Sequence, residues 1–265
     1  MRLAALSLAL LAFAASRVAA QGPRLTAPNT APMLAGIDAA SARYADVARQ
    51  IWQFAEVGYQ EMKSSALLQS ELKAAGFSVK SGVAGEPTAF VAEFGSGKPV
   101  IALLGEFDAL PGLSQDSVPV RRPLRAGGAG HGCGHHLFGT ASVASAIALK
   151  QWMQANGVKG TLRMIGTPAE EGGSGKVFMV RDGVFDDVDA VIAWHPGDDN
   201  AVTGERSMAN ISGKFRFHGV SAHAAAAPER GRSALDAVEA MDVMRDCMAQ
   251  RGYVFVPKAE IEAAR

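Results

Sequence analysis

The 265-residue sequence is poor in cysteine and has no excess of charge of either sign. Its two cysteines cannot form a disulfide framework, and its 26 basic and 26 acidic residues give a formal net charge of zero. The sequence lacks basic tracts and lacks basic residues interleaved with aromatic ones, which are the usual signature of nucleic-acid binding. It also lacks internal repeats and low-complexity tracts. We therefore expect no nucleic-acid partner.

The apolar stretch at the N-terminus is too short to cross a bilayer, which takes about 20 apolar residues. One arginine precedes an apolar run over residues 3–15, and the small residues Val18 and Ala20 follow. This arrangement is typical of a secretory signal peptide, the alternative being a membrane anchor. We predict cleavage after Ala20, export to the periplasm or the medium, and no stable membrane anchor.

The remaining chain is rich enough in hydrophobic residues, at 48% of the sequence, to bury a sizeable core. Apolar residues at helical spacing predict a helix over residues 37–54 and another over 63–75 that ends before Gly76. Farther on, short apolar runs alternate with helical segments. The expected strands are 89–94, 99–105, 161–166 and 189–194, and the expected helices are 138–154 and 175–183. This alternation predicts an α/β fold with a mainly parallel sheet flanked by helices.

The pattern changes near residue 207. An alternating strand is expected over residues 213–219, then a loop over 219–231 and a helix over 233–248. We interpret this part as the start of a second, smaller α+β domain.

The stretch GHGCGHH at residues 130–136 holds three of the six histidines and one of the two cysteines. Thiolate and neutral imidazole are the ligands that zinc-like cations prefer. The spacing does not fit a closed structural zinc site, so further ligands must come from elsewhere in the chain. A redox role for Cys133 and Cys247 is disfavoured because they form no C-x-x-C motif.

Three of the expected strands are followed by polar residues. Glu106 and Asp108 follow the second strand, Glu170 and Glu171 the third, and His195 the fourth. Ligands of open parallel sheets bind outside the carboxyl ends of the strands, so we expect these groups to converge with the histidine cluster. Paired glutamates are often only a solvated turn. Here they suggest one metal ligand and one free base for a water activated by the metal.

Four stretches together carry a family resemblance: LLGEFDALPGLSQ, GHGCGHHLFGTA, EEGGSGKVFMVRDGVFDDVDAVIAWHP and AHAAAAPERGRSALDAV. Over about residues 35–245 the chain resembles the zinc-peptidase and aminoacylase family, in its cysteine-ligand amidohydrolase branch and its aminobenzoyl-glutamate hydrolase B-subunit type. The resemblance implies a catalytic domain and a lid domain that dimerises. The expected divisions are 1–20 signal peptide, 21–34 lead-in, 35–206 catalytic domain and 207–265 partial lid domain.

The resemblance also implies a site for up to two divalent ions, zinc or manganese. Cys133 would bridge the ions, and His135 and His195 would bind one of them. Glu171 would bind the other.

Catalytic roles are likewise implied by the resemblance. Glu170 would act as the general base and Asp108 as the carboxylate that orients a ligand imidazole. His223 would be the lid histidine that stabilises the developing oxyanion.

Two departures from the family pattern stand out. His136 replaces the Asn or Asp of relatives, and this extra imidazole could perturb the ion or add a ligand. The family takes its last metal ligand, a histidine, from a C-terminal segment, but no histidine follows His223. We therefore expect the chain to be truncated within the lid domain.

The expected function is hydrolysis of the amide bond of an N-acyl or N-aroyl amino acid, such as aminobenzoyl-glutamate, in a homodimer formed through the lid. Two alternatives remain open at this point. One is a non-catalytic remnant of the fold, and the other is a metallo-dipeptidase.

Overall fold

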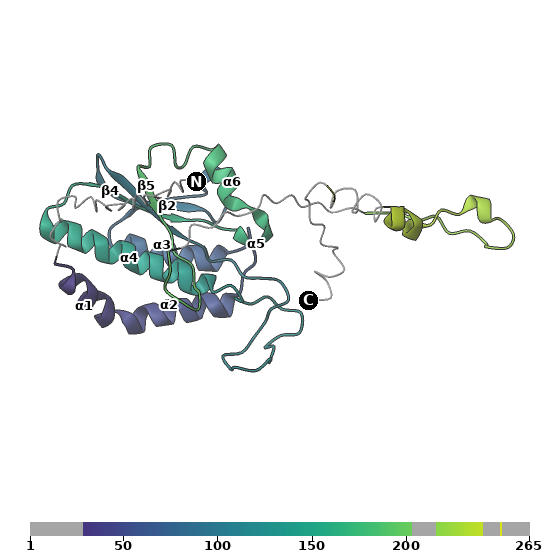
Figure 1. The fold of residues 1–265 in the computed structure, drawn as a ribbon, viewed down its shortest axis with the longest axis horizontal. Helices are drawn as coiled ribbons and strands as arrows, with labels where there is room; N and C mark the ends of the chain where they lie inside the picture. Colours follow the sequence, from purple (N-terminus) through teal and green to yellow (C-terminus); the bar gives the residue numbers. More distant parts are fainter. Residues whose placement is uncertain (1–28, 203–215, 241–249, 251–265) are drawn as a thin grey trace, which may run out of the picture.

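The structure is a computed structural model that describes residues 29–202, 216–240 and 250. The predicted signal peptide, Cys247 and much of the predicted lid domain lie outside the described residues. The described part contains a five-stranded sheet with helices on both faces, as predicted for an α/β fold (Figure 1). The helices are α1 (Ala31–Ala39), α2 (Ser41–Phe54), α3 (Met62–Ala74), α4 (His135–Asn156), α5 (Glu170–Gly173) and α6 (Gly175–Arg181). The strands are β1 (Ser78–Ser81), β2 (Phe90–Ser96), β3 (Val100–Gly105), β4 (Gly160–Gly166) and β5 (Ala190–Ile192).

The sheet is mixed, with less parallel pairing than the sequence predicts. The strand order is β1-β2-β4-β3-β5. β3 is parallel to both β4 and β5, whereas β2 is antiparallel to β1 and to β4. Parallel neighbours need a crossover of about a dozen residues or more, and residues 82–89 between β1 and β2 are too few for one. The three strands predicted to carry chemistry are all parallel, so their carboxyl ends share one edge.

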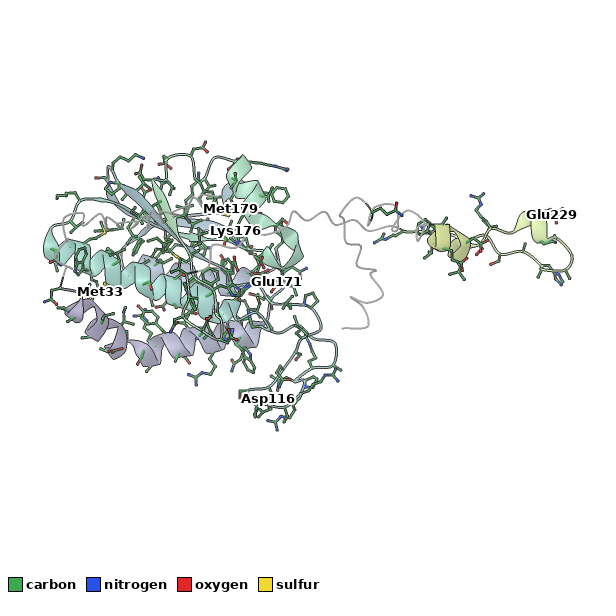
Figure 2. All side chains as sticks on the ribbon, in the orientation of Figure 1. Met33, Asp116, Glu171, Lys176, Met179 and Glu229 are labelled. Atoms are coloured by element: carbon green, nitrogen blue, oxygen red, sulfur yellow. The ribbon has the colours of Figure 1, made fainter. Side chains whose placement is uncertain are left out.

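Two hydrophobic clusters hold the helices to the two faces of the sheet. On one face α4 packs against β3 and β4 and is covered by α1, α2 and α3. Leu103 and Met164 point into the cluster on that side, while Ala102 and Ile165 point to the other side. There they meet the fully buried Met179 of α6, labelled in Figure 2. Burying such a side chain stabilises the fold by about 1.5–3 kcal/mol.

Two predicted helices have different bounds in the structure. The helix expected over residues 37–54 is two helices, α1 and α2, separated at Ala40. The alanine-rich helix α4 begins at His135, earlier than residue 138. Gly134 has a left-handed φ of 78°, which lets the loop turn directly into the helix. His135 is therefore part of a rigid element and not of the loop.

Residues 216–240 contain a short antiparallel bridge between Val220 and Arg232, and the 3-10 turn η2 (Pro228–Arg230) within the predicted loop. A helix covers residues 234–240, and the rest of the helix predicted to residue 248 lies outside the described residues. Of the strand predicted over 213–219, residues 216–219 form no strand and the others are not described. The division into two domains stays a prediction.

Among the described helices, none combines the length and the apolar character that crossing a membrane would need.

Candidate metal centre

The polar residues predicted to converge do lie at the shared edge of the three parallel strands. Glu106 and Asp108 follow β3, and Asp108 is 1% exposed. Glu170 and Glu171 open the short helix α5 after β4, and His195 follows β5. The parallel pairing of β3 with β4 and β5 places these three segments side by side. The loop before α4 adds the cysteine and histidine of the GHGCGHH stretch.

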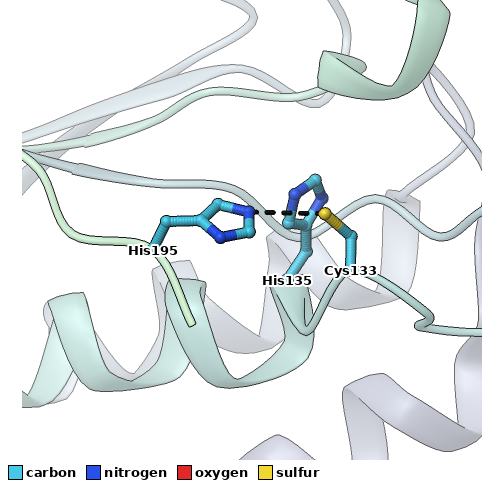
Figure 3. Close-up of side chains that lie close together, drawn as sticks. All are labelled: Cys133, His135 and His195. Atoms are coloured by element: carbon cyan, nitrogen blue, oxygen red, sulfur yellow. Dashed lines mark hydrogen bonds between the residues drawn. The ribbon is translucent and has the colours of Figure 1, made fainter. Parts of the chain in front are cut away.

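Three of the predicted metal ligands come together in one group. One donor atom each of Cys133, His135 and His195 lies within 4.8 Å of the others (Figure 3). The Cys133 Sγ and the His195 Nε2 are 3.4 Å apart. A thiolate with two imidazoles is a donor set that suits zinc, and three protein ligands leave a position open for a water or substrate.

Gly134 allows the loop before α4 and the segment after β5 to approach each other. A Cβ at this position would lie 3.0 Å from the Pro196 ring, in addition to the strain of its left-handed φ. Only glycine avoids both costs. The close packing of these two segments brings Cys133 and His195 within contact.

Asp108 connects two of the predicted ligands. Its Oδ1 lies 2.9 Å from the His135 Nδ1, and its Oδ2 accepts the backbone N–H of Glu171 at 2.8 Å. A carboxylate only accepts hydrogen bonds, so the His135 Nδ1 carries a proton. Such a contact fixes the tautomer and the orientation of a metal-binding imidazole. The Nε2 of the same ring lies 2.9 Å from the Glu106 Oε2.

The buried imidazole of His135 lies between carboxylates. Burial lowers its pKa, but the hydrogen bonds and charges of Asp108 and Glu106 outweigh this and raise the pKa to about 10. This is a strongly negative environment for an imidazole. The buried Glu171 Oε1 also has no hydrogen-bond partner among the described residues. Buried polar atoms normally have partners, and a divalent cation would supply one. The residues present therefore fit a metal ion.

The two adjacent glutamates differ in exposure. The Glu170 side chain is 45% exposed, and its Oε2 lies 4.0 Å from the His135 Nε2. Glu171 is partly buried, and burial raises its pKa. A second group of clustered donors consists of Glu106, His135 and Glu170, and the predicted ligand Glu171 belongs to neither group. The roles predicted for the two glutamates stay predictions.

The Cys133 thiol has a raised pKa of about 11, caused first by burial and then by the neighbouring Glu171. Catalytic and redox-active cysteines instead have lowered pKa values. The environment of Cys133 thus disfavours a free nucleophilic thiolate. Binding a metal ion would deprotonate the thiol directly.

The other two histidines of the stretch belong to neither group of clustered donors. The Nε2 of His131 lies 3.1 Å from the Ile51 carbonyl oxygen, to which it donates. The rings of His131 and His136 pack with their centroids 5.1 Å apart. Burial, and then the neighbouring His136, lowers the pKa of His131 to about 4. We assign both imidazoles to the packing between α4 and α2.

Three residues near the site are given no specific chemical role by the sequence, although Glu106 was expected to converge with the histidine cluster. Glu106 follows a strand end, and its Oε1 accepts a hydrogen bond from the Lys176 Nζ. Glu61 is fully buried, and its Oε1 accepts the N–H of Ala169 at 2.8 Å. Ala169 has a left-handed φ of 54°, so this contact holds a strained residue directly before Glu170. The only sequence signal for Glu61 and Lys176 is charge within helical or turn segments, which is common on any surface.

His223 lies outside the clustered donors. In the described residues its Nδ1 accepts the N–H groups of Ala225 and Ala226, at 3.2 and 3.1 Å. These contacts fix a turn within its own segment. Its predicted oxyanion role stays a prediction.

Comparisons with known proteins give the family of the chain. The peptidase family M20/M25/M40 matches residues 102–261. The B-subunit of the p-aminobenzoyl-glutamate hydrolase of Escherichia coli is 53% identical over 206 residues, which are 77% of this chain and 43% of that protein. The Xaa-Arg dipeptidase of Mus musculus is 33% identical over 214 residues, which are 76% of this chain and 46% of that protein. The chain thus spans somewhat less than half the length of these relatives.

A solved structure gives the same fold. The YXEP protein of Bacillus subtilis, a dinuclear metal binding peptidase from the M20 family, superposes with a TM-score of 0.54 at 27% identity. The match covers 61% of this chain and 44% of that one. The predicted family resemblance is confirmed, and this chain belongs to peptidase family M20/M25/M40.

Proposed function

We propose that the chain carries a metal-dependent amidohydrolase centre that cleaves the amide bond of an N-acyl or N-aroyl amino acid. The observation that carries the proposal is the grouping of Cys133, His135 and His195 within 4.8 Å, beside the half-exposed Glu170. Three ligands with an open position are typical of catalytic metal sites. The substrate class follows the name of the Escherichia coli relative, a p-aminobenzoyl-glutamate hydrolase.

When bound, a divalent ion supplies Lewis-acid polarisation of the scissile carbonyl and lowers the pKa of water at the site. Cys133, His135 and His195 would hold one ion, and Glu171 would hold a second with the shared thiolate. We propose zinc or manganese for these positions, because both accept carboxylate and imidazole ligands.

Glu170 is the proton carrier in this proposal. Its exposed carboxylate takes a proton from the attacking water and passes it to the nitrogen of the leaving amine. Asp108 keeps the His135 Nε2 free by holding the proton on Nδ1. Glu61 holds the backbone at Ala169, which directs Glu170 toward the site. His223 would stabilise the oxyanion that forms on the carbonyl.

Further parts of the proposal rest on the sequence. The N-terminal stretch directs export, residues 207–265 belong to a lid domain, and the lid forms a homodimer. The small acyl amino acid would bind between the lid and the edge of the sheet.

A second candidate is a metallo-dipeptidase. It is favoured by the resemblance to the Xaa-Arg dipeptidases of Mus musculus and Homo sapiens, which are 33% and 32% identical. The same residues can serve both reactions, because each reaction hydrolyses the amide bond between an acyl group and the nitrogen of an amino acid.

The test is hydrolysis of p-aminobenzoyl-glutamate and of Xaa-Arg dipeptides by the zinc- or manganese-loaded protein. We expect release of p-aminobenzoate that stops with a chelator and returns when metal is added back. Glu170→Gln should lower kcat by about 100- to 10,000-fold, the usual contribution of a general base. Faster cleavage of the dipeptides would favour the second candidate. Absence of hydrolysis of either substrate by metal-loaded protein would overturn the proposal.

A further inference from the structure

The short helix α5 and the residues on either side of it form a strained turn (Figure 1). Ala169 before the helix and Ser174 after it both have a left-handed φ, of 54° and 55°. Within the helix, Glu171 departs from helical geometry, with a φ of −68° and a ψ of 76°. Residues other than glycine keep a left-handed backbone only where the surrounding structure holds them. The backbone that carries the two glutamates therefore needs support from other segments.

One such segment, residues 58–61, contacts both ends of this turn. At the first end, the Glu61 Oε1 accepts the N–H of Ala169 at 2.8 Å. At the other end, the Tyr59 hydroxyl donates to the Gly173 carbonyl oxygen at 2.7 Å. Tyr59 also has a left-handed φ, of 64°. The segment thus holds the beginning and the end of the turn at the same time.

Two glycines allow the segment to lie directly on the turn. A Cβ at Gly173 would lie 2.9 Å from the Tyr59 Cε2 and 2.6 Å from the Ala169 Cβ. A Cβ at Gly58 would lie 3.0 Å from both the Cα and the Cβ of Ala169. Contacts this short are not tolerated in a packed protein, so a larger residue at either position would push the segment and the turn apart. The hydrogen bond from Tyr59 is therefore part of a close-packed contact.

We propose that Tyr59 is a positioning residue for Glu170: its hydroxyl, together with Glu61, clamps the turn so that the Glu170 carboxylate faces the site. The proposal rests on the proposed function, in which Glu170 carries the proton. The Glu170 side chain is 45% exposed, and its Oε2 lies 4.0 Å from the His135 Nε2. Because an exposed side chain receives little packing, its position depends on the backbone that carries it.

Loss of the Tyr59 hydroxyl should affect the reaction more than substrate binding. Without this donor, the strained backbone at Ala169 and Ser174 can relax. A shift of about 1 Å in a catalytic group can lower a rate by about 100-fold. Since Glu61 still holds the first end of the turn, we expect a smaller loss for Tyr59→Phe, about 10-fold in kcat. KM should change by less than about 2-fold, because the loss is confined to the proton carrier.

The experiment measures hydrolysis of p-aminobenzoyl-glutamate by the zinc-loaded chain for the wild type, Tyr59→Phe, Glu170→Gln and the double variant. If Tyr59 acts through Glu170, adding Tyr59→Phe to Glu170→Gln should lower the remaining rate by less than about 2-fold. Tyr44→Phe is the matched control, since it removes a hydroxyl from α2, and it should keep the wild-type kcat. Wild-type kcat in Tyr59→Phe, or a further loss of about 10-fold in the double variant, would overturn the proposal.

Hydrogen–deuterium exchange tests the clamp without turnover. In Tyr59→Phe we expect the amides of residues 167–176 to exchange about 2–10-fold faster than in the wild type, which corresponds to the net contribution of one hydrogen bond. The amides of α4 should exchange as in the wild type, and Tyr44→Phe should match the wild type in both segments. Equal exchange of residues 167–176 in Tyr59→Phe and the wild type would overturn the clamp.

Failure of the clamp differs from failure of the function. A wild-type chain that hydrolyses the substrate, with unchanged kcat and unchanged exchange in Tyr59→Phe, would overturn only the role of Tyr59. A metal-loaded wild-type chain that hydrolyses neither p-aminobenzoyl-glutamate nor Xaa-Arg dipeptides would overturn the proposed function and with it the catalytic purpose of the clamp.

Discussion

Replacing Asp108 with asparagine tests how the site is held together. The Asp108 carboxylate accepts from His135 through Oδ1 and from the backbone of Glu171 through Oδ2. Asparagine has one accepting oxygen and one NH₂ group, so it can satisfy only one of these donors. If its NH₂ faces His135, the ring must place its proton on Nε2, and Nε2 can then no longer bind a metal.

The expected magnitude follows from these contacts. Losing the supporting partner of a metal-binding histidine typically lowers metal affinity by about 10–100-fold, which is about 1.4–2.8 kcal/mol. If the asparagine oxygen instead accepts the hydrogen bond from His135, the backbone N–H of Glu171 loses its acceptor. This loss lowers folding stability by about 1–3 kcal/mol. Either orientation of the asparagine side chain in Asp108→Asn therefore produces a measurable loss. One orientation lowers metal affinity, and the other lowers folding stability.

Zinc titration by calorimetry and urea denaturation of the metal-free protein measure the two losses. Asp187→Asn is a matched control, since this exposed aspartate also pairs with a basic side chain, Arg163. We expect Asp108→Asn to show the loss in zinc affinity, in stability, or in both. Wild-type values in both measurements would refute the role of Asp108 in orienting His135.

Three further predictions concern neighbouring groups. Glu61→Ala removes the acceptor of two buried donors, so we expect the free energy of unfolding in urea to fall by about 2–6 kcal/mol. A loss below about 1 kcal/mol would contradict this. Burial, and then the charge of Glu61, raises the pKa of Glu86 to about 7. The folded chain then keeps a proton that the unfolded chain releases, so stability falls as pH rises from about 4.5 to 7. Between pH 5 and pH 8 the urea midpoint should fall less for Glu86→Gln than for the wild type. Equal falls in the two proteins would argue against a contribution of Glu86 to the pH dependence. In a Cys247→Ser background, zinc should protect Cys133 from alkylation, and equal labelling with and without zinc would exclude it as a ligand.

The convergence of the site could be predicted because it depends on local patterns. Apolar runs of strand length indicated β3, β4 and β5, and parallel strands end at the same edge of a sheet. The antiparallel pairing of β1 and β2 was missed because strand direction depends on the length and course of the connection, and apolar periodicity carries no information on either.

The supporting contacts could not be predicted for a related reason. Glu106 and Lys176 are 70 positions apart, and Glu61 and Ala169 are 108 apart. Such pairs form only when the helices and turns are placed on the sheet. The sequence also placed His135 in a loop, whereas its burial at the start of α4 depends on the left-handed turn at Gly134. Candidate ligands could therefore be predicted from the sequence, but not the residues that contact them.

The most direct test of the metal centre is an anomalous difference map at the zinc edge from crystals of the zinc-loaded protein. We expect a peak in contact with the Cys133 Sγ and the Nε2 atoms of His135 and His195. A map without density between these three side chains, in protein that binds zinc in solution, would contradict the metal centre proposed here.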